Sequence, residues 1–138
     1  MKNLTKSKKW YLRECWRLMS LRVRSREGDY TNCITCGKLH HFKDLQAGHY
    51  IHNVLDYDDM NIQPQCVSCN KFKHGKLDEY TFYLIKTYGL KKVEDLRLRA
   101  KKALKGERYT IDELEKIYAR LVHDSCTISA RKDNDLCI

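Results

Sequence analysis

The chain has 138 residues, of which 42% are apolar and 33% are charged, and its formal net charge is +9. This length excludes a second full domain, and no stretch approaches the roughly 20 apolar residues that a membrane-spanning helix needs. Because the start of the chain also lacks the apolar segment of a signal peptide, we expect a cytosolic protein whose seven cysteines are thiols or metal ligands rather than disulfides.

The first predicted element is an amphipathic helix over residues 5–24. Its apolar face and its basic stripe lie on different sides of the helix. The apolar face contains Leu12, Cys15, Trp16, Met19 and Val23, and the basic stripe contains Lys6, Arg13, Arg17 and Arg24. The sequence Glu27-Gly28-Asp29 ends this helix. Residues 1–27 are therefore expected to form a basic helical arm, with Cys15 buried.

Residues 30–69 have too few periodic apolar positions for an apolar core to hold them together. They contain two Cys-x-x-Cys motifs, and 29 residues lie between Cys36 and Cys66. Two such motifs can bring four thiolates to one tetrahedral zinc ion, with Gly37 supplying the turn after the first. A closed four-thiolate site leaves no position for a substrate, so we expect a structural Zn²⁺ bound by Cys33, Cys36, Cys66 and Cys69. Two redox motifs are the alternative, but the βαβ pattern that they need is missing.

Helical patterns return over residues 77–88, 93–104 and 110–123. Gly89 and Gly106 end the first two, and Thr110 and Glu113 form a capping box at the start of the third. We therefore expect a zinc-bound core over residues 28–90, a basic helical extension over 91–124, and a flexible tail over 125–138. The tail contains Cys126 and Cys137, for which the sequence indicates no role.

Four polar side chains within and just after the loop between the two cysteine motifs can supply the chemistry of phosphodiester hydrolysis. His49 can take a proton from the attacking water near neutral pH, and the amide of Asn61 can fix the tautomer and direction of that imidazole. Asn70 and His74 are four residues apart and share one face if a helix follows Cys69, so they can bind a divalent cation. Each of these residues alone is more typical of a turn-forming loop position.

Most of the chain, from about Trp10 to Glu115, resembles the phage NinG (Rap) recombination protein family. The resemblance is carried by Cys33-Ile-Thr-Cys36-Gly37, Gln46-Ala-Gly-His-Tyr50, Asn61-Ile-Gln-Pro-Gln-Cys66-Val-Ser-Cys69-Asn70, Gly75, Tyr80 and Tyr88-Gly89. The middle block also looks like the zinc-bearing His-Me finger of phage endonuclease VII. The resemblance implies an α+β fold, namely a zinc-stabilised ββα-metal (HNH, His-Me finger) core with flanking N- and C-terminal helices.

The same resemblance implies a nuclease that acts on D-loops and Holliday junctions in the cytoplasm of the phage's bacterial host. It carries over His49 as general base and Asn70 as a metal ligand, with Mg²⁺ or Mn²⁺ as the cation. Many His-Me finger enzymes have an Asp or His ligand directly before the catalytic His, where this chain has Gly48. His74, Asp44 or water are the alternatives for that ligand position.

Positive charge is concentrated towards the two ends of the chain. Lys+Arg outnumber Asp+Glu by nine to two in residues 1–27 and by twelve to nine in 91–138, whereas 28–90 contain six against seven. Basic flanks indicate binding to DNA phosphates, although a solvated basic surface is the alternative. The predicted phosphate-binding residues are Arg13, Arg17, Arg24, Lys91, Lys92, Lys101 and Lys102.

Two other functions are compatible with these patterns. The first is a non-catalytic zinc module that binds DNA or a recombination partner, and the second is a nuclease on plain duplex DNA. Symmetrical cuts at a four-way junction would be natural for a homodimer, but the sequence leaves the oligomeric state open.

Overall fold

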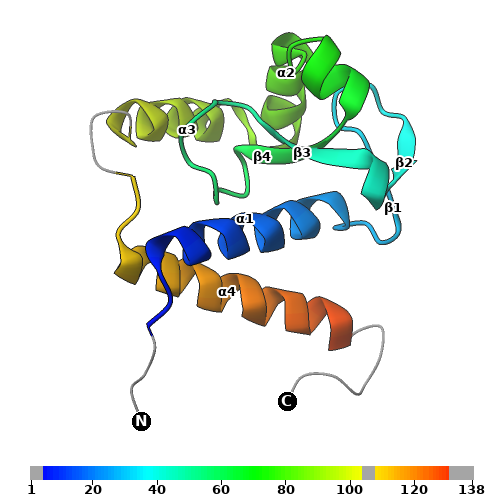
Figure 1. Cartoon of the computed structure of the whole chain (residues 1–138). Helices are drawn as coiled ribbons and strands as arrows, with labels where there is room; N and C mark the ends of the chain where they lie inside the picture. The colour runs from blue at the N-terminus through cyan, green and yellow to red at the C-terminus, as the bar shows by residue number, and fades with distance from the viewer. Residues whose placement is uncertain (1–4, 104–107, 131–138) are drawn as a thin grey trace. The chain divides into compact units, whose positions relative to one another are not determined.

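The computed structural model describes the backbone of residues 5–103 and 108–130, and side chains as far as residue 125 (Figure 1). The elements in chain order are α1 (Lys8–Arg24), β1 (Tyr30–Asn32), β2 (Leu39–His41), the 3₁₀ turn η1 (Phe42–Asp44), β3 (Leu45–His49), β4 (Ile62–Cys66), the π-helical turn η2 (Ser68–Phe72), α2 (Leu77–Tyr88), α3 (Leu90–Ala103) and α4 (Ile111–Ala130). Helices and two small antiparallel hairpins thus make up the described chain, which confirms the predicted α+β class.

The structure divides into two compact units. The first unit combines residues 1–19 with 109–138, and the second unit comprises residues 20–108. Helix α3 therefore belongs to the same unit as the cysteine motifs, whereas residues 91–124 were expected to form a separate helical extension. The reason is that the apolar face of α3 is buried: Val93 and Leu96 join the core of the second unit.

The first unit is built on the beginning of α1 and on α4. Cys15 and Leu114 are fully buried, and the Cys15 Sγ lies 3.6 Å from the Leu114 carbonyl oxygen. The rings of Trp10 and Tyr11 make edge contacts with Tyr118. Burial raises the pKa of the Cys15 thiol to about 11, so this cysteine behaves as an apolar core residue, as predicted.

The second unit contains the two hairpins. Strand β1 pairs with β2 from Tyr30 opposite His41, and β3 pairs with β4 from Leu45 opposite Cys66 to His49 opposite Ile62. Every residue of β4 is buried, so this strand lies at the centre of the unit.

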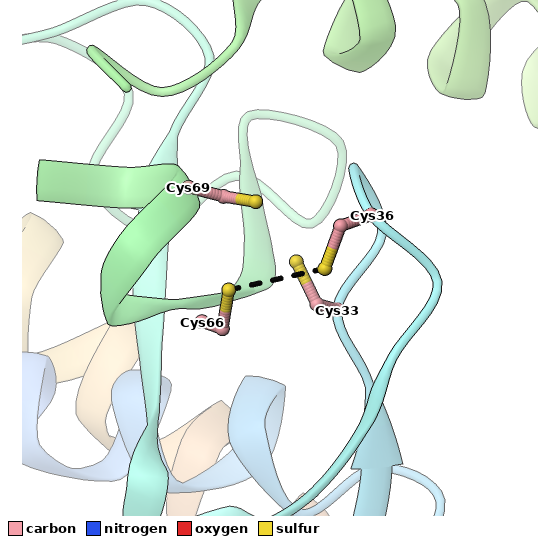
Figure 2. Close-up of side chains that lie close together, drawn as sticks. All are labelled: Cys33, Cys36, Cys66 and Cys69. Carbon is pink, nitrogen blue, oxygen red and sulfur yellow. Dashed lines mark hydrogen bonds between the residues drawn. The ribbon is translucent and has the colours of Figure 1, made fainter. Parts of the chain in front are cut away.

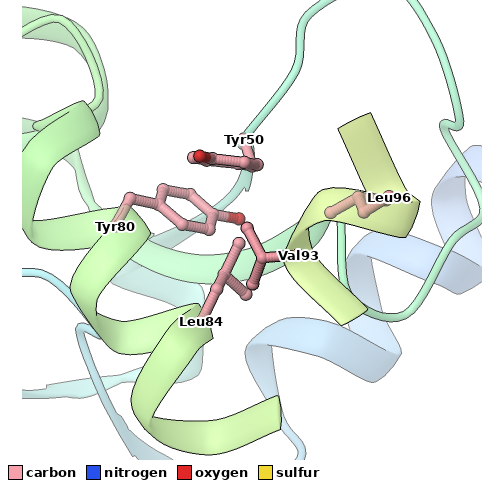
Figure 3. Packing of buried hydrophobic residues seen from close by; sticks show 5 residues of the cluster. All are labelled: Tyr50, Tyr80, Leu84, Val93 and Leu96. Carbon is pink, nitrogen blue, oxygen red and sulfur yellow. The ribbon is translucent and has the colours of Figure 1, made fainter. Parts of the chain in front are cut away.

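Helices α2 and α3 supply the apolar core of the second unit. Tyr80 and Leu84 of α2 lie against Val93 and Leu96 of α3, and Tyr50 covers the ring of Tyr80 (Figure 3). Burial raises the pKa of Tyr80 well above its ordinary range, so its hydroxyl remains a hydrogen-bond donor. That hydroxyl donates to the carbonyl oxygen of Gly48 at 2.8 Å, which ties the end of β3 to α2.

Three helices differ in length from the prediction, and the first of them, α1, begins at Lys8 rather than at residue 5. Helix α3 begins at Leu90, directly after Gly89, whose positive φ of 92° ends α2. Helix α4 continues to Ala130, into the segment predicted to be a flexible tail, because residues 125–130 contain neither Gly nor Pro to end it. The remainder of that tail, with Cys137, and the side chain of Cys126 lie outside the described residues. Among the helices that the structure describes, none has the length and apolar character to cross a membrane.

Candidate metal centre and histidine site

The four cysteines of the two Cys-x-x-Cys motifs meet at one point in the second unit. Cys33 and Cys36 lie in the turn between β1 and β2, Cys66 ends β4, and Cys69 lies in η2 (Figure 2). Their sulfur atoms all lie within 4.8 Å of one another, and those of Cys36 and Cys66 are 3.9 Å apart. Zinc bound tetrahedrally at about 2.3 Å from each sulfur requires sulfurs about 3.8 Å apart. This quartet therefore fits a structural zinc ion.

Backbone hydrogen bonds hold the two motifs in this arrangement. Gly37 has a positive φ of 74° and its N–H donates to the Cys33 carbonyl at 2.8 Å, which closes the first turn. The N–H of Ile34 donates to the carbonyl of Pro64 at 3.0 Å and so links the first turn to β4. The first motif is thus fixed directly beside the second.

The thiols of the quartet differ in acidity. Burial opposes ionisation of Cys33, but hydrogen bonds from the Thr35 hydroxyl and from backbone N–H groups lower its pKa to about 6. Burial raises the pKa of Cys69 to about 12 and also raises that of Cys36. These hydrogen bonds favour the thiolate form of Cys33, which is the form that binds zinc.

His49 lies at the end of β3, next to an acidic side chain that the sequence analysis did not single out. Its Nε2 is 3.0 Å from Oδ1 of Asp56, which lies in the loop between β3 and β4. The side chains are 19% and 23% exposed, so the pair is partly buried but open to solvent. An aspartate at this distance can fix the tautomer and direction of the ring.

Asn61 is fully buried and binds the loop that carries Asp56. Its Oδ1 accepts from the Ile51 N–H at 2.8 Å, and its Nδ2 donates to the carbonyls of Ile51 and Val54, both at 3.0 Å. The amide was predicted to fix the imidazole itself. In the structure Asp56 takes that position, and Asn61 shapes the loop.

Asn70 lies in η2 and reaches back to β3. Its Nδ2 donates to Oε1 of Gln46 at 2.7 Å, which leaves Oδ1 pointing towards Gly48. A Cβ atom built on Gly48 would lie 3.1 Å from this oxygen and would overlap Oε1 of the buried Gln65. A side chain of any size at position 48 would therefore collide with these two amide groups.

The structure does not extend a helix from Asn70 to His74. The π-helical turn η2 ends at Phe72, and His74 follows in a left-handed conformation with φ 52° and an exposed side chain. Asp44 is exposed in η1. Within the described ranges 5–103 and 108–130, the cysteine quartet is the one close cluster of three or more His, Cys, Asp or Glu ligand atoms.

The predicted phosphate-binding residues fall into two groups. Lys91, Lys92, Lys101 and Lys102 are exposed on α3, and Arg13 is exposed on α1. Arg17 pairs with Glu14 at 3.0 Å, and the guanidinium of Arg24 donates to Ser20 and to the carbonyl of Phe42 within the second unit. The guanidinium of Arg24 is thus committed to the fold, whereas the four lysines have the exposure that DNA contact requires.

Comparisons with a family model and with curated proteins identify the same family for this chain. Residues 1–130 match the family model described as Bacteriophage Lambda NinG protein. Protein ninG of Salmonella phage P22 and Protein ninG of Escherichia phage lambda are each 30% identical over 118 residues, which is 83% of this chain and 55% of the relative. Protein ninG of Escherichia phage 933W is 29% identical over 119 residues. The chain thus spans about half the length of these curated relatives. No solved structure matches it.

Proposed function

The chain belongs to the bacteriophage NinG family, and on this premise we propose that it is a metal-dependent endonuclease that hydrolyses phosphodiester bonds in branched DNA, with His49 as general base. The branched substrates are D-loops and Holliday junctions, and the place of action is the host-cell cytoplasm. The observation that carries the proposal is the 3.0 Å pairing of His49 with Asp56 at the end of β3, in the hairpin whose other strand, β4, ends at Cys66 of the cysteine quartet.

The roles of the side chains follow from this pairing. His49 takes the proton of the attacking water while its Nε2 is held by Asp56. The carboxylate stabilises the positive charge that the ring gains. Asn61 keeps the loop in shape so that Asp56 stays beside the ring.

Two metals have separate places in this proposal. The four cysteines would hold a zinc ion that links the β1–β2 turn to the end of β4, and such a four-thiolate site would have no open position for DNA. A Mg²⁺ or Mn²⁺ ion, when bound, neutralises phosphate charge and stabilises the leaving oxygen. Asn70 is the residue proposed to hold that cation, because its Oδ1 turns towards the backbone directly before His49.

A second candidate function is a DNA-binding zinc module without catalysis. The observation that favours it is the lack of a carboxylate or imidazole ligand at Gly48, together with the exposed position of His74 after η2. In that case the exposed lysines of α3 would bind DNA without cleavage.

Cleavage of a labelled four-way junction and of a matched linear duplex tests the proposal. We expect the wild-type protein to cut the junction with Mg²⁺ or Mn²⁺ and not with a chelator. His49→Ala should lower the single-turnover rate by about 100-fold or more, in the range typical of a lost general base.

The matched control is His123→Ala, which removes an 81% exposed imidazole of α4 in the first unit and should cut at the wild-type rate. Tight junction binding without cleavage by the wild-type protein would reject the nuclease and favour the DNA-binding module. Equal cutting of junction and duplex would support nuclease activity but contradict selectivity for branched DNA.

A further inference from the structure

Gln65 is a buried glutamine of β4 whose amide is only half used. Its Nε2 donates to the carbonyl of Gly75 at 2.8 Å and to the hydroxyl of Thr35 at 3.2 Å. Because a carbonyl partner requires a donor, these bonds fix which end of the amide is nitrogen. The other end, Oε1, is fully buried and has no hydrogen-bond partner among the residues that the structure describes. A buried carbonyl oxygen without a partner is unfavourable, so a ligand that binds it would stabilise this arrangement.

This oxygen points to the same place as the Asn70 side chain. A Cβ on Gly48 would overlap Oε1 of Gln65, lie 2.9 Å from its Cδ and lie 3.1 Å from Oδ1 of Asn70. Gly48 directly precedes His49 in β3. Two side-chain carbonyl oxygens from different elements thus converge in the space that a side chain at position 48 would fill.

Two converging amide oxygens suit a hard divalent cation. Mg²⁺ and Mn²⁺ prefer oxygen ligands, and a neutral pair leaves the remaining positions to water and phosphate. The orientation of both oxygens is set by the other end of each amide, because Asn70 donates to Gln46 and Gln65 donates to Gly75. The ligands are therefore held in place before a cation arrives.

We propose that Gln65 Oε1 and Asn70 Oδ1 together bind the divalent cation, so that Gln65 supplies the ligand that Gly48 cannot. The inference rests on the proposed function for the use of this cation, but the binding itself is independent of cleavage. Gln65 would then fill the ligand position for which the sequence left His74, Asp44 and water as alternatives.

Mn²⁺ binding to the zinc-loaded protein tests the inference, with the free Mn²⁺ signal in electron paramagnetic resonance as the readout. Gln65→Met and Asn70→Ala should each weaken Mn²⁺ binding by about tenfold or more while zinc content is retained. The matched control is Gln63→Met, because Gln63 is equally buried in β4 but its Nε2 donates to the carbonyl of Asp59. That control should bind Mn²⁺ as the wild-type protein does.

A rescue variant keeps the test informative if Gln65→Met folds poorly. In Gly48→Asp with Gln65→Ala, the new carboxylate occupies the vacated space, so Mn²⁺ should bind more tightly than to Gln65→Ala alone. Unchanged Mn²⁺ affinity in folded Gln65→Met, or no Mn²⁺ binding by the wild-type protein, overturns the inference. Mn²⁺ binding that depends on Gln65 without any DNA cleavage upholds the inference and rejects the nuclease.

Discussion

The Asp56 carboxylate contacts the imidazole of His49 from the loop between β3 and β4, and in the proposed mechanism its charge stabilises the ring after it has accepted a proton. We predict that Asp56→Asn lowers the single-turnover rate of junction cleavage by about 10- to 100-fold, because the amide keeps the shape but loses the negative charge that stabilises the protonated ring. The rate should fall without a change in junction affinity.

Asp59→Asn serves as the control for this prediction. Asp59 lies in the same loop, but its carboxylate pairs with Arg22 at 3.2 Å and its side chain is 57% exposed. An exposed pair of this kind contributes little, so the variant should retain the wild-type rate. Equal losses in both variants would mean that loop shape, and not the charge beside His49, sets the rate.

The sequence predicts some residues of the site far better than others. The quartet was predictable because ligand spacing in a Cys-x-x-Cys motif is a local property. Asp56 and Gln65 were not, because their roles depend on the path of the loop and on the register of β3 against β4. The sequence indicates only that Gly48 lacks a ligand. In the structure, the absence of a side chain at Gly48 leaves room for the side-chain amides of Gln65 and Asn70.

At the scale of elements, the start of α4 offers a pH-dependent prediction. The Thr110 N–H donates to the Glu113 carboxylate at 2.7 Å, and the Glu113 N–H donates to the Thr110 hydroxyl at 3.2 Å. Hydrogen bonds from the Thr110 backbone and hydroxyl lower the pKa of Glu113 below its ordinary value of 4.5. The stabilisation is therefore complete above pH 4.5 and is lost as the pH falls through the lowered folded value.

Urea unfolding followed by circular dichroism checks this. Thr110→Ala should lower the free energy of unfolding by about 1 kcal/mol at neutral pH, as is typical for a lost N-cap. Glu113→Gln should flatten the acid dependence of stability below pH 4.5. Asp112→Asn is the control, since that first-turn carboxylate lies outside the capping box, and it should leave the acid dependence intact.

Helices were predicted more closely than the elements around the site. Helix α2 has the predicted bounds, because its periodicity is clear and Gly89 ends it. The strands are three to five residues long, and three residues span too little chain for an alternating pattern to be recognised. The π-helical turn η2 has no known local signal, and it arises where Cys69 and Asn70 must face different partners.

At the scale of the whole molecule, the two units should respond differently to metal removal. The region around the quartet has few buried apolar side chains, whereas the first unit has its own apolar core with Cys15 and Leu114. We therefore predict that stripping zinc removes hydrogen-exchange protection from β3 and β4 while amides of α4 retain much of theirs.

Two cysteine variants sharpen this prediction. Cys66→Ala should lose stoichiometric zinc and the protection of the hairpin, whereas Cys15→Ala, which alters a buried cysteine outside the quartet, should keep both. A metal-free wild-type protein with full protection of β3 and β4 would contradict the structural role of zinc.

The close approach of Gln65 to Gly48 also constrains how this family can vary. A mutation that adds a side chain at position 48 meets an occupied space, and a mutation that shortens position 65 leaves a buried hole. Each of these changes alone destabilises the fold, so we expect substitutions at positions 48 and 65 to be correlated. A relative with an acidic residue directly before the histidine is expected to have a small residue at the position of Gln65. The residues at these two positions would then be inherited together as a pair.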